Sequence, residues 1–145
     1  MYRTYDSNGR HLEDVLVQRI IEAERNQQEK KKTDAITSVY NVVPKKCFVV
    51  IASDKKGQGN IHEDRYKDAV EPGVKLAGYN PIRNIDGTGP NWFHDMVDNL
   101  RTCELAIVDL TEMRFNCIWE LGILNAWDKP VIIIFLMPSI IPNID

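Results

Sequence analysis

The stretch LAIVDLTEMRFNCIWELGILNAWDKPVIIIFLM, residues 105–137, decides the fold of this chain. An apolar run ends at Asp109, a short polar turn follows, a mostly apolar helix carries Glu120, and a second apolar run fills residues 131–137. Strand, turn, helix and strand in this order join two parallel strands by a right-handed crossover. Because open α/β sheets bind ligands at the carboxyl edge of their strands, we expect Asp109 to lie at that edge.

The preceding residues continue the same alternation of strands and helices. Their apolar spacing and their Gly and Pro positions predict three helices and two strands. The helices are an amphipathic one over about 11–32, one over about 61–76 that is interrupted at Pro72 and Gly73 and ends at Gly78, and one over about 91–102. The strands are residues 47–52 and a short strand over 79–86, which Pro81 places near a sheet edge or at a strand start.

This alternation is typical of an α/β fold, and we predict a flavodoxin-like, doubly wound parallel sheet with flanking helices, plus the N-terminal amphipathic helix. We place the N-terminal helix and connector in residues 1–44 and the α/β domain in residues 45–145. The apolar stripe of the N-terminal helix is expected to pack on the domain or on a second copy of the chain.

Composition limits the possible partners and compartments. Charged residues make up 27% of the 145 residues and the formal net charge is −3, so no basic field for nucleic acid is present. The longest apolar run is far shorter than the ~20 residues that span a bilayer, and the N-terminus has no apolar signal segment. Three cysteines, Cys47, Cys103 and Cys117, indicate reduced core thiols and a cytoplasmic protein. His62 and His94 lack partners at ligand spacing, so we predict no metal and no cofactor.

Polar residues follow the strands where parallel strands share one edge. These residues are Ser53 and Asp54 after the first strand, Asp86 after the second, and Asp109 after the third. We expect them to line a binding site, although Asp54 and Asp86 also suit solvated turns. Asp109 has the alternative role of a helix cap or turn anchor.

Glu120 is the sharpest candidate. It lies on a helix that is apolar nearly all round, which predicts burial. Burying a carboxylate costs folding free energy unless the group has an ion-pair or hydrogen-bond partner, so an unpaired one suggests a functional role. Burial would raise its pKa, as functional sites often require. Asn116 lies four residues earlier on the same helix face and is expected to hold a ligand group. The alternative is a structural ion pair with Lys129 or Arg114.

Gly57 and Gly59 belong to a polar loop before the second predicted helix. Backbone N–H groups of such a loop can bind a phosphate at the helix start. The loop matches neither GxGxxG nor GxxxxGK[ST], so a surface loop is the alternative interpretation.

The motif residues resemble the nucleoside 2-deoxyribosyltransferase-like superfamily, a relative of the TIR-type NAD-cleaving domains. The resemblance rests on Ala-Ile-Val-Asp-Leu-Thr (106–111), Trp-Glu-Leu-Gly (119–122), Lys-Pro-Val (129–131), Ala-Gly-Tyr (77–79) and Cys-Glu-Leu (103–105), and covers about residues 46–135. Three residues differ from the family pattern: Glu112 replaces the usual Gly, and Arg114-Phe115 replaces the usual Asn-Pro.

The resemblance implies a flavodoxin-like sheet and cleavage of the N-glycosidic bond of a nucleoside, nucleotide or NAD, by hydrolysis or deoxyribosyl transfer. Glu120 would be the nucleophile, Asp109 the ligand of a sugar hydroxyl, and Asn116 the matching family Asn. A homo-oligomer that uses the N-terminal helix is also expected. Two alternatives stay open: a nucleotide-sensing module that binds without cleaving, and a TIR-like protein-interaction domain in a signalling or defence system.

Overall fold

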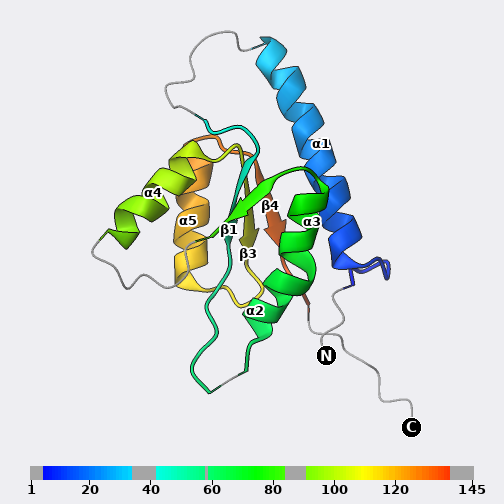
Figure 1. The fold of residues 1–145 in the computed structure, drawn as a ribbon, viewed down its shortest axis with the longest axis vertical. Helices are drawn as coiled ribbons and strands as arrows, with labels where there is room; N and C mark the ends of the chain where they lie inside the picture. The colour runs from blue at the N-terminus through cyan, green and yellow to red at the C-terminus, as the bar shows by residue number, and fades with distance from the viewer. Residues whose placement is uncertain (1–4, 34–41, 58, 84–90, 138–145) are drawn as a thin grey trace.

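The computed structural model describes residues 5–33, 42–57, 59–83 and 91–137. Its centre is a four-stranded parallel sheet with the strand order β2-β1-β3-β4 (Figure 1). The strands are β1 (Lys46–Val50), β2 (Asn80–Ile82), β3 (Leu105–Asp109) and β4 (Val131–Ile134). β2 is an edge strand, as Pro81 predicted, because proline cannot donate a ladder hydrogen bond.

Helices cover both faces of the sheet. One face carries α1 (Leu12–Thr33) and the helical stretch α2 (Ile61–Arg65), η1 (Tyr66–Val70) and α3 (Glu71–Leu76). The other carries α4 (Trp92–Thr102) and α5 (Phe115–Ala126), so that the sheet is the middle of three layers (Figure 1). The predicted α/β class with flanking helices is confirmed.

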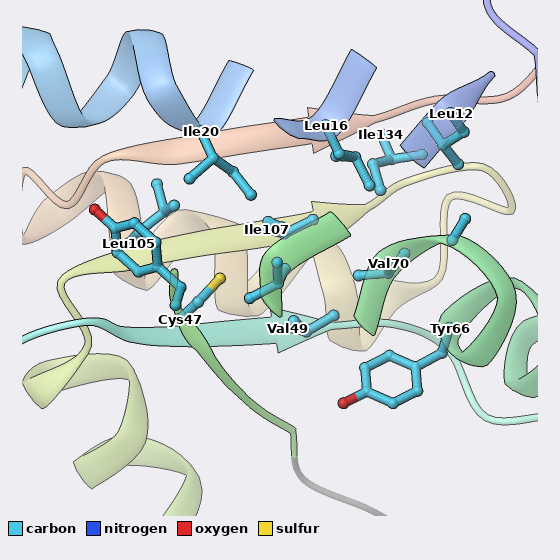
Figure 2. Close-up of a cluster of buried hydrophobic side chains, with 13 residues drawn as sticks. Leu12, Leu16, Ile20, Cys47, Val49, Tyr66, Val70, Leu105, Ile107 and Ile134 are labelled. Carbon is cyan, nitrogen blue, oxygen red and sulfur yellow. The ribbon is translucent and has the colours of Figure 1, made fainter. Parts of the chain in front are cut away.

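Alternate strand residues supply the two cores, because successive side chains of a strand point to opposite faces. Cys47, Val49 and Ile107 pack toward α1 together with Leu16 and Ile20, as Figure 2 shows. The intervening strand residues pack toward α4 and α5; they are Phe48, Val50, Ala106 and Val108. All three cysteines are buried and free, as predicted.

The expected break at Pro72 and Gly73 is wrong. The helical backbone continues from Ile61 to Leu76, and a π-helical segment, η1, immediately precedes Pro72. Proline lacks an N–H and its ring crowds the carbonyl four residues back, and a wider turn can relieve that clash. The helix ends before Gly78, whose φ of 81° favours glycine, as predicted.

The apolar circumference of α5 is not buried, which corrects the expectation from the sequence. Only Cys117 and Leu124 of this helix are buried, whereas Phe115 is 83% exposed and Trp119 is 44% exposed. Trp119 lies beside Phe93 of α4, with ring centroids 5.9 Å apart. The helix is an outer layer of the fold, so half of its surface faces away from the sheet whatever its composition.

Of the helices in the described parts of the chain, none has both the length and the apolar character that crossing a bilayer requires.

Candidate functional site

An open cleft of about 510 Å³ lies where β1 ends, between the start of α4 and the first half of α5. Three residues predicted for the site line it together: Ser53, which follows β1, and Asn116 and Glu120 of α5. The structure thus brings these three side chains to the carboxyl end of the sheet. The full lining is Phe48, Val49, Val50, Ile51, Ala52, Ser53, Trp92, Met96, Arg114, Phe115, Asn116, Cys117 and Glu120.

Glu120 is half-buried in this cleft. Burial raises the pKa of its carboxyl group to about 7, since desolvation disfavours the charged form. No residue in the described parts of the chain forms a hydrogen bond or an ion pair with this carboxyl group. The two basic side chains that the sequence suggested as ion-pair partners of Glu120 have other partners. Lys129 donates to the Cys103 carbonyl, and Arg114 pairs with Glu112.

Asp109 lies at the end of β3, as predicted, but it is outside the cleft lining. It is 5% exposed, and its Oδ2 accepts a hydrogen bond from Arg65 Nη1 at 2.6 Å. Its Oδ1 accepts the N–H of Thr111 at 2.9 Å. The structure therefore shows the turn-anchor arrangement that the sequence left open for Asp109, reinforced by a buried ion pair.

Asp54 caps α2. Its two carboxylate oxygens accept the N–H groups of His62 and Glu63, each at 2.9 Å. Burial raises the pKa of Asp54, but these two donors and the electrostatic attraction of His62 and Arg65 together outweigh it, so the net shift is downward. Two N–H groups at this helix start are thus already satisfied by the chain. Gly57 and Gly59 have φ of 86° and 81° and do not line the cleft, and Asp86 lies outside the described residues.

Cys117 lies beside Glu120 in the cleft wall but is unsuited to attack a substrate. Burial raises the pKa of its thiol to about 11, and the charges of Glu120 and Asp109 add to the effect. The thiolate is the reactive form of cysteine, and very little of it exists at neutral pH with such a pKa. Of these two neighbouring groups of α5, Glu120 and not Cys117 is therefore the candidate nucleophile.

Arg114 also lines the cleft. The sequence predicted no binding role for it and suggested it only as a possible ion-pair partner of Glu120. Its Nε and Nη2 donate to Oε2 of Glu112 at 2.8 and 2.7 Å. The other oxygen of Glu112 lies 3.0 Å from Nε2 of His62, a buried side chain of α2. The only sequence signal was position, because Arg114 immediately precedes the helix that carries Glu120.

Among residues 5–33, 42–57, 59–83 and 91–137, no cluster of His, Cys, Asp or Glu side chains is arranged to hold a metal ion. The fold and the cleft define an α/β protein with a parallel sheet and a carboxyl group of raised pKa beside a cleft at the carboxyl edge. Neither the family models nor the curated proteins nor the solved structures contain a match to this chain.

Proposed function

We propose that this protein cleaves the N-glycosidic bond of a nucleoside, nucleotide or NAD, with Glu120 as the nucleophile. The observation that carries the proposal is the position of Glu120: it is half-buried, has no partner in the described residues, and lines an open cleft. An unpaired carboxyl group in such a place costs folding free energy, and functional sites are where such costs are commonly found.

The strand order supports a flavodoxin-like fold for this site. The order β2-β1-β3-β4 corresponds to the first four strands of the flavodoxin-like order. In that topology β2 lies on one side of β1, and β3 and β4 lie on the other. The point between β1 and β3, where the strand order reverses, is where such sheets bind ligands. The cleft begins at the end of β1, which agrees with that rule.

The reaction would proceed in two displacements. Glu120 forms a bond to the anomeric carbon while the bond from that carbon to the base nitrogen breaks, and the electron pair of the broken bond stays on that nitrogen. A purine or pyrimidine base then takes up a proton from water, whereas nicotinamide leaves NAD as a neutral molecule. Water, or a second base, then attacks the same carbon and releases the Glu120 carboxylate, as in retaining glycosidases with a carboxylate nucleophile. Asn116, one helical turn before Glu120, would orient the sugar.

The test is release of free base or nicotinamide from a panel of nucleosides, nucleotides and NAD. We expect product from the wild-type chain and a loss of at least about 10³-fold in kcat for Glu120→Gln, because the amide cannot form the ester intermediate. Glu22→Gln is the matched control, since Glu22 is an exposed residue of α1 that pairs with Arg19. Turnover that survives in Glu120→Gln, with the variant folded, would refute the nucleophile assignment.

One observation favours a second candidate, a module that binds a nucleotide without cleaving it. The family resemblance gives Asp109 a sugar hydroxyl, yet both of its oxygens are occupied by Arg65 and the Thr111 N–H. Saturable binding of a nucleotide by calorimetry, with no base released over hours, would select this candidate. Absence of both binding and turnover would leave the TIR-like interaction domain.

A further inference from the structure

Arg114 introduces a fixed positive charge at the cleft. It precedes the first residue of α5 and lines the cleft with Asn116 and Glu120. Among the cleft-lining residues that the structure describes, Arg114 is the only base and Glu120 is the only acid. A ligand in this cleft therefore meets a carboxyl group along the helix and a guanidinium group at the helix start.

The guanidinium group is held in place from one side. Glu112 occupies the edge formed by Nε and Nη2, and Glu112 is itself held by His62, which is only 4% exposed. No hydrogen bond joins Nη1 to a described residue, so the edge formed by Nη1 and Nη2 can still donate to a ligand. Arginine edges match the oxygens of phosphate in geometry and charge, and a fixed side chain loses less entropy on binding.

The charge of Glu112 offsets much of the positive charge of Arg114, but it leaves the N–H groups of the other guanidinium edge free to donate hydrogen bonds. Glu112 is partly exposed, and burial raises its pKa less than its hydrogen bond from Arg114, the largest influence, lowers it. Its carboxylate is thus ionised and engaged by Arg114 and His62. We assign Glu112 a positioning role, and we assign recognition of an anion to the remaining edge of Arg114.

The spacing along α5 agrees with a sugar phosphate. Arg114 lies six residues before Glu120, which corresponds to a rise of roughly 9 Å along a helix. A sugar whose anomeric carbon contacts Glu120 can reach this far through a phosphate on its 5′ carbon. In addition, no side chain among the described residues forms a capping hydrogen bond at the start of α5, so its first N–H groups add positive potential near Arg114.

We propose that the cleft selects 5′-phosphorylated nucleotides over unphosphorylated nucleosides, and that Arg114 is the specificity-determining residue that contacts the phosphate. The reaction on the bound nucleotide rests on the proposed function, but the preference between the two ligands does not. It is a property of binding, and it can be measured in a variant that performs no chemistry.

The experiment compares matched ligands in the Glu120→Gln background. Adenosine, deoxyadenosine, the corresponding pyrimidine nucleosides, their 5′-monophosphates and NAD are titrated by calorimetry into three proteins: E120Q alone, E120Q with R114Q, and E120Q with R19Q. We expect R114Q to reduce the affinity ratio of monophosphate to nucleoside by about 10- to 100-fold, as for a lost hydrogen-bonded charge. R19Q removes an exposed charge from α1 and should leave the ratio unchanged.

The affinity ratio of monophosphate to nucleoside is measured within one protein, so a partly misfolded variant does not change it.

R114K serves as a second variant, because lysine keeps the charge without the planar edge, and an intermediate ratio is expected. A ratio that is the same in E120Q and in E120Q with R114Q, or no binding of either ligand, overturns the assignment of Arg114. Failure of the wild-type chain to release base overturns only the proposed reaction. A preference for NAD over the monophosphates would assign the site to a pyrophosphate.

Discussion

Glu120 carries both the proposed chemistry and a measurable cost in stability. Its pKa is raised from an ordinary value of 4.5 to about 7 by burial alone. The folded chain therefore binds a proton at this group more tightly than the unfolded chain does. Stability from this group is fully present below pH 4.5 and is lost as the pH rises toward and through 7.

We predict that Glu120→Gln stabilises the protein relative to the wild type more at pH 8 than at pH 5. The glutamine side chain stays neutral, so it does not lose the stability that ionisation removes from the wild type. The difference between the two pH values should be on the order of 2 kcal/mol, since one unit of pKa shift is worth about 1.4 kcal/mol. Urea unfolding at each pH measures it.

Glu22→Gln is the control for this prediction, because Glu22 is exposed and its pairing with Arg19 is a surface contact. Its effect should be small and nearly the same at both pH values. An equal effect of Glu120→Gln at pH 5 and pH 8 would show that the carboxyl group is solvated in the folded protein.

Single residues were predictable from sequence where their role depends on neighbours along the chain. Ser53 follows a strand, and Asn116 and Glu120 share a helix face, so a pattern of strand ends and helical spacing places all three in the cleft. The partner of Asp109 was not predictable, because Arg65 is 44 residues away in the sequence and meets it only in the folded chain.

At the scale of elements, the Arg65–Asp109 pair joins α2 to the end of β3. Both side chains are almost fully buried, at 7% and 4% exposure. Replacing one member leaves the other charge buried and unpaired, which is far more costly than the pair itself is stabilising. The contact therefore fixes the position of the helix that also supplies His62 to Glu112.

We predict that Asp109→Asn lowers the free energy of unfolding by about 3 to 5 kcal/mol, the usual cost of breaking a buried ion pair. Chemical denaturation measures the loss. Asp98→Asn is the matched control, because Asp98 forms an exposed pair with Arg101 at 2.6 Å and should cost less than about 1 kcal/mol. The double change Arg65→Met with Asp109→Leu should recover part of the loss, and no recovery would contradict the pairing explanation.

The elements themselves show where sequence patterns stop being informative. The strand and helix order followed from apolar runs and turn residues, and the parallel sheet followed from that order. The exposure of α5 did not follow, because apolar composition cannot tell a helix covered on all sides from one in an outer layer. Phe115 and Trp119 are exposed for the second reason.

For the whole molecule, the sequence suggested a helix and connector in residues 1–44 beside a domain in residues 45–145. The structure describes α1 as part of the same core as the sheet: Leu16 and Ile20 are buried in one cluster with Cys47, Val49 and Ile107 (Figure 2). Its apolar stripe is thereby covered within one chain. An assembly through α1 would have to use other residues of that helix.

We predict that residues 45–145 alone do not fold cooperatively. Without α1, the apolar side chains of the sheet and of α3 that pack against this helix would be exposed to water, and each fully buried aliphatic side chain contributes roughly 1.5 to 3 kcal/mol. Urea unfolding of the truncated chain, followed by circular dichroism, should show no sharp transition. A transition with the same midpoint as the full chain would establish residues 45–145 as an independent domain.

Two neighbouring isoleucines of α1 test the same idea without truncation. Ile20 is fully buried in the core cluster, whereas Ile21, which is turned by roughly 100° around the helix axis, is 49% exposed. Because Ile20→Ala leaves a cavity between α1 and the sheet, it should lower the free energy of unfolding of the whole chain by about 2 to 5 kcal/mol. Ile21→Ala changes the same residue type at the next position and should cost less than about 1 kcal/mol.

If both variants lose only helical signal while the sheet unfolds as before, α1 is a separate unit. If Ile20→Ala lowers the single transition of the entire molecule, α1 is part of the fold that holds the cleft.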